Sequence, residues 1–351
     1  MTEHNTIAAN DVPLGVKPDY APVRVMISDA SRTRIVALLD ETIGVGRYVI
    51  AGPNASDFDV AFVSRDITGR STKHQIEPET QVWYDRMLGA ASLRWVHIHA
   101  AGADREVYLE LLARGVTLTT SAGSNAIVVA HTALAAMLAL ARVFPHLLRA
   151  QREHRWASLF GGPLPRDIAG QTAVLVGWGR IGQTLGALLC ALGMHVIAVR
   201  REVGEHRCAD GVETVAYAQL DTVLPRADWL VLACPLTSAT RNLIDHRALS
   251  LLPRGAHLVN VARGEIVVEP ALVDALTQAR LAGAYLDVFA HEPLSTDSPL
   301  WDMENVIVTP HSAGFSDGNE GRVDGIFVEN LSRWLAGQPM SNVVASAVTS
   351  I

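Results

Sequence analysis

The sequence predicts an α/β protein built from two doubly wound parallel-sheet domains. Short β-branched runs alternate with helical patterns from Val23 onward, which is typical of crossover units in parallel sheets. The alternation runs in two series, with a long apolar helical pattern at 125–144 between them. The chain has 351 residues, more than a single hydrophobic core usually supports, so we expect one domain for each series.

The first series predicts a small open α/β unit that ends near Gly123. Its apolar, β-branched runs predict strands at 23–28, 59–63, 93–99 and 116–119. Apolar residues at helical spacing predict helices between them, at 33–41, 79–90 and 105–113. Because strands and helices alternate, we expect the strands to lie parallel.

The second series, which follows the long helix, predicts a larger doubly wound sheet. Its strands are expected at 172–176, 195–199, 229–234, 257–261, 284–288 and 306–309. A last helical pattern at 321–334 lies beyond the final strand. We expect this helix to fold back on the first unit.

Charge and cysteine content argue against several classes of function. The formal net charge of −7 disfavours nucleic acid as a partner, since phosphate backbones attract basic surfaces. The three cysteines, Cys190, Cys208 and Cys234, fit neither a disulfide framework nor paired zinc ligands. We therefore expect reduced thiols, a cytoplasmic protein and no metal site.

Two segments of the sequence bear on targeting and on membrane insertion. Residues 1–20 lack the basic start and apolar run of a signal peptide, so we expect a disordered tail. The apolar stretch 126–143 is interrupted by His131 and Arg142 and ends before Pro145. It predicts a buried or interfacial helix rather than a membrane span.

A glycine-rich turn opens the second series. Gly177, Gly179 and Gly182 form G-x-G-x-x-G directly after an apolar strand pattern and at the start of a helical one. The first glycine permits a tight turn, the second lets backbone approach a pyrophosphate, and the third allows close helix packing. A glycine turn without a ligand is the alternative, but strand, helix and spacing all favour a dinucleotide site.

Two arginines end the next predicted strand. Arg200 stands where an NAD-binding chain usually carries the acid that holds the ribose hydroxyls, and Arg201 follows it. No carboxylate is there to repel a 2′-phosphate. The alternative is a solvated pair of charges, but their place predicts NADP as the preferred cofactor, with NAD as the other candidate.

Three chemically matched residues follow three later strands of the second series. Arg263, Glu292 and His311 each come after an apolar β run, so they are expected at the carboxyl edge of one sheet. Reduction of a 2-keto acid needs a hydride on carbon, a proton on oxygen and a partner for the carboxylate. Arg263 can bind the carboxylate, His311 can supply the proton, and Glu292 can orient His311.

Each of these residues alone has a structural explanation. Arg263 can form an ion pair, Glu292 can cap a turn, and His311 can be a satisfied core histidine. Together with the glycine loop, the set predicts a hydride-transferring oxidoreductase acting on a small 2-keto or 2-hydroxy acid.

Five ordered motifs carry a resemblance to a known family: G-W-G-R-I-G, P-L-T-S-A-T, V-N-V-A-R-G, L-D-V-F-A-H-E-P-L and T-P-H-S-A-G. They resemble the signatures of the D-isomer-specific 2-hydroxyacid dehydrogenases, of the glyoxylate/hydroxypyruvate reductase kind, over about 95–311. The resemblance implies a flavodoxin-like substrate domain formed by 21–123 and 315–351. It also implies a Rossmann NAD(P)-binding domain at 124–314, with a cleft between the two that closes on substrate.

The resemblance also implies roles for single residues. Asp287 would contact the nicotinamide carboxamide, Val261 would offer backbone to the nicotinamide, and Cys234 and Pro235 would line the adenosine side. Ala101 and Gly102, in the loop H-A-A-G-A-D, would bind the substrate carboxylate together with Arg263. The remaining cofactor contacts implied by the motifs are Arg180, Ile181, Thr240, Ser312 and Gly314.

The sequence departs from the family pattern at two positions. His131 stands where the family usually has glutamate, and Arg200 replaces the acid that binds ribose. Near the substrate loop, His97 and His99 either tune specificity or form a polar pair on a strand edge.

Other functions on the same fold remain open from sequence. A nucleotide-sensing corepressor-like protein would share the glycine loop, and a dehydrogenase of formate or phosphite would share the arginine and histidine. A metal-dependent dehydrogenase is disfavoured because no cluster with ligand spacing is present. We expect glyoxylate or hydroxypyruvate as substrate, and a homodimer that covers the apolar helix 126–143.

Overall fold

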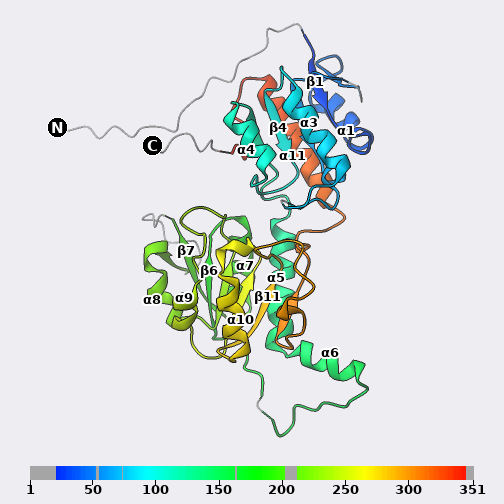
Figure 1. Ribbon diagram of the computed structural model, residues 1–351. Coiled ribbons are helices and arrows are strands. Elements are labelled where there is room, and N and C mark those ends of the chain that lie inside the picture. Colours follow the sequence, from blue (N-terminus) through cyan, green and yellow to red (C-terminus); the bar gives the residue numbers. More distant parts are fainter. Residues whose placement is uncertain (1–20, 53–54, 73, 163, 202–211, 345–351) are drawn as a thin grey trace, which may run out of the picture. The chain divides into compact units, whose positions relative to one another are not determined.

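The computed structural model describes residues 21–52, 55–72, 74–162, 164–201 and 212–344 (Figure 1). The expected disordered tail at 1–20 lies outside these residues. Contacts divide the described chain into two compact units. Unit 1 consists of 21–71, 76–121 and 320–344, and unit 2 consists of 72–75 and 122–319.

Unit 1 contains a five-stranded, all-parallel sheet in the order β2-β1-β3-β4-β5. The strands are β1 (Val23–Met26), β2 (Tyr48–Ile50), β3 (Val60–Val63), β4 (Trp95–Ile98) and β5 (Thr117–Thr120). This order is that of flavodoxin-like sheets, as the resemblance implied. The sequence did not predict β2, a three-residue strand in which only Tyr48 is buried.

The helices of unit 1 cover both faces of its sheet. They are α1 (Asp29–Thr42), α2 (Arg65–Thr68), α3 (Pro78–Gly89), α4 (Glu106–Ala113) and α11 (Asn319–Leu335). Buried side chains alternate along the strands, so one face packs on α1 and α11 and the other on α3 and α4. The return of α11 to unit 1 is confirmed, since Phe327 stacks on Phe62 with ring centroids 4.5 Å apart.

Unit 2 contains a seven-stranded, all-parallel sheet in the order β12-β11-β10-β9-β6-β7-β8. The strands are β6 (Thr172–Val176), β7 (His195–Arg200), β8 (Glu213–Ala216), β9 (Trp229–Leu232), β10 (Ala256–Asn260), β11 (Leu281–Leu286) and β12 (Val306–Val308). The order reverses between β6 and β9, which is the Rossmann arrangement with one added strand. The sequence did not predict β8, an edge strand without a buried residue.

The long apolar pattern forms one helix, and a second helix that the sequence did not predict follows it. They are α5 (Ala126–Ala141) and α6 (Phe144–Arg152), which meet at an angle of 72°. Pro145 sits in the first turn of α6, and it cannot donate the backbone bond that would continue α5. No single helix in the described residues is long and apolar enough to cross a membrane, and only this bent pair together reaches the length.

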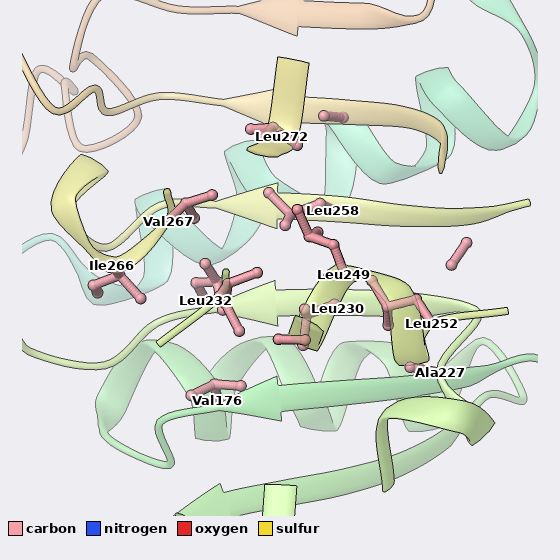
Figure 2. Close-up of a cluster of buried hydrophobic side chains, with 14 of the residues drawn as sticks. Val176, Ala227, Leu230, Leu232, Leu249, Leu252, Leu258, Ile266, Val267 and Leu272 are labelled. Carbon is pink, nitrogen blue, oxygen red and sulfur yellow. The ribbon is translucent and has the colours of Figure 1, made fainter. Parts of the chain in front are cut away.

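The other helices of unit 2 lie on the two faces of its sheet. They are α7 (Arg180–Ala191), α8 (Leu220–Val223), α9 (His246–Leu251) and α10 (Glu269–Thr277). One core joins α5 and α7 to the sheet, and the other lies under α8, α9 and α10. Figure 2 shows part of the second core, where Val176, Leu232 and Leu258 from three strands share one apolar layer with side chains of α9 and α10.

Candidate active site

The glycine loop brings the carboxyl ends of β6 and β9 into contact. Gly177 has a φ of 105°, and a Cβ built on it would lie 2.6 Å from the carbonyl oxygen of Ala233. A Cβ on Gly182 would lie 2.2 Å from the carbonyl oxygen of Gly177. Side chains are therefore excluded at both positions, and the loop closes tightly at the point where the strand order reverses.

The start of α7 fits the phosphates of a dinucleotide. Gly179 is its N-cap, no side chain caps it in the described structure, and a Cβ there would meet nothing within 4 Å. Free space thus faces the first-turn amides of a twelve-residue helix, where an anion is favoured. Arg180 is exposed with its side chain against Gly123, and Ile181 is half-buried.

Charged and polar residues gather where the adenosine end of a dinucleotide is expected. Arg200 ends β7 in register with Ala216 of β8, and Arg201 is exposed beyond it. Tyr217 follows β8, and burial together with the nearby Cys234, which follows β9, raises the pKa of its phenol. Burial raises the pKa of the Cys234 thiol to about 11, so this thiol is not a nucleophile at neutral pH.

Tyr217 was not among the predicted site residues. Burial is the main cause of its raised pKa, and the positive charge of Arg201 opposes the rise. Its only sequence signal was a tyrosine after the weak strand β8. Thr240, by contrast, ties a turn together, since its Oγ1 donates to the carbonyl of Pro235 at 2.7 Å and accepts from Thr237 N at 2.8 Å.

A carboxylate and an imidazole pair at the carboxyl edge of the sheet. Nδ1 of His311 lies 2.8 Å from Oε2 of Glu292, whose Oε1 accepts a bond from Phe289 N at 3.1 Å. Burial raises the pKa of Glu292, but the His311 hydrogen bond and the charge of Arg263 outweigh it, so the net pKa is lowered. The carboxylate therefore stays ionised at neutral pH.

The exposure of the two partners differs. The side chain of His311 is 49% exposed and that of Glu292 is 18% exposed. With Nδ1 held by Glu292, Nε2 is the ring nitrogen left to meet a substrate. His311 has a φ of 51°, and its own N–H donates to the carbonyls of Asp287 and Thr309. The backbone thus holds an uncommon conformation that aims the ring.

Arg263 reaches the same place from β10. A Cβ on the next residue, Gly264, would lie 1.8 Å from the carbonyl carbon of Phe289, so only glycine lets this loop touch the segment that leads to Glu292. The half-buried side chain of Arg263 donates to the carbonyl of Ala262 at 2.8 Å. The structure therefore brings Arg263, Glu292 and His311 together from the ends of β10, β11 and β12, as the sequence predicted.

The carboxylate of Asp287 forms hydrogen bonds with other residues of the protein. Its buried carboxylate accepts bonds from Thr309 Oγ1 at 2.5 Å, Ser312 N at 2.8 Å and Ala313 N at 3.0 Å. These bonds hold the loop that carries His311, a positioning role that the sequence did not reveal. The contact with a nicotinamide implied for Asp287 stays a prediction.

The other implied cofactor residues surround the same edge. Val261 is buried at the end of β10, and Ser312 is half-buried in the His311 loop. A Cβ on Gly314 would lie 2.3 Å from the amide nitrogen of Asn125, so this glycine lies against the N-cap of α5. His131 is exposed further along α5.

A second residue that the sequence analysis missed forms a hydrogen bond with the segment that contains Glu292. Thr72, in the four-residue segment that groups with unit 2, donates from Oγ1 to the carbonyl of Glu292 at 3.0 Å. The ring of His74 lies 5.2 Å from the ring of His291. Nothing in the sequence near Thr72 marked it, because its partner is far along the chain.

The loop expected to bind the substrate carboxylate follows β4 in unit 1. Ala101 is exposed and Gly102 is half-buried, so both backbone groups lie at the surface of this unit. The idea that His97 and His99 sit on a strand edge is wrong, because β4 lies between β3 and β5. His97 is fully buried, and burial lowers its pKa to about 3.

The hydrogen bonds of His97 form one directional chain. Ser121 Oγ donates to the carbonyl of Ile98 and therefore accepts from Nε2 of His97 at 3.0 Å. Nδ1 of the neutral ring is then an acceptor, so Thr119 Oγ1, 2.7 Å away, donates to it while accepting from Trp95 Nε1 at 2.8 Å. Every polar atom of the ring is satisfied, so His97 is structural.

Among the described residues, no group of three or more His, Cys, Asp or Glu side chains is placed to hold a metal ion.

The sequence is similar to a family model and to several known dehydrogenases and reductases. The sequence model described as "D-isomer specific 2-hydroxyacid dehydrogenase, NAD binding domain" matches residues 134–313. D-3-phosphoglycerate dehydrogenase of Mycobacterium bovis is 34% identical over 322 residues, which is 91% of this chain and 58% of that protein. Glyoxylate reductase of Korarchaeum cryptofilum is 34% identical over 75% of this chain and 79% of its own length.

Solved structures agree in fold. A D-isomer specific 2-hydroxyacid dehydrogenase from Xanthobacter autotrophicus in complex with NADPH has a TM-score of 0.72 and 29% identity, covering 93% of this chain and 98% of that one. An NADPH-dependent glyoxylate/hydroxypyruvate reductase from Sinorhizobium meliloti has a TM-score of 0.71 and 27% identity, with the same coverage.

The chain thus spans about 58% of the length of its phosphoglycerate dehydrogenase relatives in Mycobacterium, and most of the length of the two solved structures. The family match over the nucleotide-binding unit, the identity over nine-tenths of the chain and both sheet orders agree. This chain belongs to the D-isomer-specific 2-hydroxyacid dehydrogenase family.

Proposed function

We propose that this protein reduces a small 2-keto acid to the 2-hydroxy acid, with a nicotinamide dinucleotide as the reductant. A bound NADPH or NADH supplies the hydride. The observation that carries the proposal is the His311–Glu292 pair, 2.8 Å apart, beside the positive charge of Arg263. An acid and a cation at the carboxyl edge of a Rossmann sheet match the needs of carbonyl reduction.

The residues divide the chemistry between them. Arg263 binds the substrate carboxylate and polarises the carbonyl next to it. As the carbonyl carbon gains the hydride, the N–H bond at Nε2 of His311 breaks and the proton forms an O–H bond on the carbonyl oxygen. Glu292 keeps the imidazolium oriented through Nδ1 and offsets its charge. The keto acid is reduced, the nicotinamide is oxidised, and solvent returns the proton to His311.

Glyoxylate and hydroxypyruvate are the proposed substrates. A curated relative is named glyoxylate reductase, and one solved structure is named glyoxylate/hydroxypyruvate reductase. The test is a screen of the purified full chain with glyoxylate, hydroxypyruvate, pyruvate and bulkier 2-keto acids, each with NADPH and NADH. Absorbance loss at the reduced cofactor band with any of these acids supports the proposal, and no turnover with all of them overturns it.

NADPH is the proposed reductant. Arg200 ends β7 where NAD-binding chains carry an acid, and Arg201 follows it as an exposed residue. A charge-assisted bond contributes about 1.5–3 kcal/mol, which corresponds to a preference of roughly 10–100-fold for the 2′-phosphate. Arg200→Asp should swing the ratio of the NADPH and NADH specificity constants toward NADH. Equal constants in the wild type would refute the preference.

We also propose a homodimer, for a different reason from the one the sequence suggested. Most of the apolar surface of α5 is buried within unit 2. A group of exposed apolar side chains lies on α6 and the segment after it, where Trp156 and Phe160 are each 96% exposed. Light scattering should give a dimer for the wild type, and a monomer for the double variant Trp156→Ser, Phe160→Ser. A monomeric wild type would reject the proposal.

A reducing, cytoplasmic location stays part of this proposal. Cys190 and Cys234 are both free thiols, and Cys208 lies outside the described residues. Thiol titration of the native protein, without reductant, should find all three cysteines reduced.

A further inference from the structure

A chain of hydrogen bonds runs from the core of unit 2 to the loop that carries His311. Tyr285 lies on β11, and Asp287 directly follows that strand. Thr309 directly follows β12, which pairs with β11. The phenol oxygen of Tyr285 lies 2.9 Å from Oγ1 of Thr309, and this Oγ1 donates to Oδ1 of Asp287 at 2.5 Å.

These bonds run in one direction. A threonine hydroxyl has a single hydrogen, and Thr309 gives it to Asp287, so Thr309 accepts from Tyr285. Burial raises the pKa of Tyr285 to about 12, so the phenol is protonated at neutral pH and can act as the donor. Hydrogen bonds in such a chain polarise one another, and a bond that ends on a carboxylate is stronger than one between neutral groups.

Both ends of the chain are fixed. Tyr285 is fully buried, and its ring belongs to the core that joins the sheet to α5 and α7. At the other end, the carbonyl of Asp287 accepts from the N–H of His311 at 2.8 Å. The carboxylate of Asp287 accepts from the N–H groups of Ser312 and Ala313. Three consecutive amides of the loop therefore bind to one residue, which Thr309 ties to the core.

The His311 loop depends on such bonds for its shape. His311 has a φ of 51°, a conformation that a residue other than glycine keeps only where its surroundings fix it. The ring is half exposed, so packing around the side chain does not fix it. Beyond the loop, Thr132 of α5 donates from Oγ1 to the carbonyl of Ala313 at 3.0 Å. Hydrogen bonds to the backbone thus determine where the imidazole lies.

We propose that Thr309 and Tyr285 are positioning residues for the proposed reduction. They fix the carboxylate of Asp287, which fixes the backbone of the loop and so the direction of Nε2 of His311. The inference rests on the proposed function and adds two residues that touch neither the substrate nor the proton in transfer. A displaced Nε2 slows proton transfer, whereas Arg263 still binds the substrate carboxylate. The loss is therefore expected in kcat rather than in KM.

The first test is Thr309→Val, which removes the hydroxyl and keeps the shape of the side chain. With saturating cofactor, kcat should fall roughly 10-fold or more and KM should change by less than about threefold, since a charge-assisted bond corresponds to roughly 10–100-fold. Thr309→Ser keeps the hydroxyl and should retain most of the wild-type kcat. Thr172→Val, at the amino end of β6 and thus at the opposite edge of the same sheet, is the matched control.

The second test is Tyr285→Phe, which removes the first donor of the chain. It should lower kcat by roughly 2–10-fold, because a bond between neutral groups is lost. Added to Thr309→Val, it should lower kcat no further, since the chain is already broken. The double variant should nevertheless resist denaturant better than Thr309→Val, because valine leaves the buried phenol without a partner and phenylalanine removes the phenol. Stability that recovers without kcat separates positioning from a purely structural role.

Hydrogen exchange gives a readout that does not need turnover. The amides of Ser312 and Ala313 should exchange faster in Thr309→Val and in the double variant than in the wild type and in Thr172→Val. Wild-type kcat in Thr309→Val, or a further loss of kcat when Tyr285→Phe is added to it, overturns the inference. If no 2-keto acid is reduced, faster exchange of these amides supports the inference and only the proposed reaction fails, whereas unchanged exchange overturns both.

Discussion

The two units each place a histidine near the carboxyl end of a parallel strand, but the surroundings of the two rings differ. His311 in unit 2 is half exposed and pairs with the carboxylate of Glu292. His97 in unit 1 is fully buried and pairs with the hydroxyls of Thr119 and Ser121. The first ring keeps one nitrogen for a ligand, whereas the second has both nitrogens satisfied within the protein.

The comparison shows that the hydrogen-bond partner and the solvent exposure of a histidine at the carboxyl edge of a sheet decide its charge state and its role. Burial raises the pKa of the half-buried Glu292, but the His311 hydrogen bond and nearby charges lower it more strongly, so an ionised carboxylate faces the ring of His311. Hydroxyl partners and complete burial favour the neutral form, and the pKa of His97 falls to about 3. His97 is therefore expected to contribute to stability.

The largest effect on turnover is expected when the imidazole of His311 is removed. His311→Ala should lower kcat by about 10³-fold or more, because general acid catalysis contributes roughly 10²–10⁴-fold. Cofactor binding, measured by fluorescence titration, should change little. His291→Ala, an exposed histidine on the neighbouring loop, is the control and should keep wild-type turnover. Near-normal kcat in His311→Ala would remove it as the proton donor.

A smaller effect is expected when the charge of the partner is removed. Glu292→Gln should lower kcat by roughly 10–100-fold, since a neutral amide still orients the ring but no longer stabilises the imidazolium. The alkaline limb of the pH–rate profile for reduction should move to lower pH. Steady-state kinetics between pH 5 and 10 check both. An unmoved limb would show that Glu292 acts on geometry alone.

In unit 1 the expected effect is on stability. Thr119→Val leaves Trp95 Nε1 and His97 Nδ1 buried without their partner, at a cost of about 1–3 kcal/mol in the free energy of unfolding. Thr117→Val, on the same strand but outside this chain of bonds, is the control. Denaturant unfolding measures the difference. Equal stability of the two variants would contradict the structural role of His97.

The last prediction concerns the pH dependence of that stability. The pKa of His97 is lowered from 6.5 to about 3, so the unfolded chain binds the proton more readily than the folded one. The contribution of a neutral His97 is thus complete above pH 6.5 and is lost as pH falls toward 3. The slope is about 1.4 kcal/mol per pH unit for one histidine.

Comparison of wild type with His97→Gln isolates this slope. Between pH 7.5 and 4.5 the free energy of unfolding should fall less in His97→Gln than in the wild type, because the variant lacks the proton that His97 takes up on unfolding. His99, whose pKa is also lowered to about 3, continues to contribute in both proteins. Parallel pH profiles for the two proteins would mean that His97 is not neutral in the fold.

Much of the site could be predicted because its chemistry is local. The spacing of Gly177, Gly179 and Gly182 requires a turn between a strand and a helix whatever the rest of the chain does. Arg263, Glu292 and His311 each follow a strand pattern, and parallel strands bring their carboxyl ends to one edge. Predicting the strands was therefore enough to predict the convergence.

Elements with weak local patterns were missed. β2 is three residues long and β8 has no buried residue, so neither shows apolar alternation. The long helix was predicted to reach 144, whereas α5 ends at Ala141, and α6 was not predicted. Tyr217 was missed with β8, since its place beside Cys234 depends on that strand pairing with β7.

By itself the sequence determined the two parallel sheets, the nucleotide loop and the three charged residues after successive strands, because strand patterns and backbone sterics act over a few residues. Tertiary structure alone decided how the polar groups are used. Asp287 holds the His311 loop, and His97 is buried while His311 is not. These roles depend on burial and on partners distant in sequence, which set the charge state of each group.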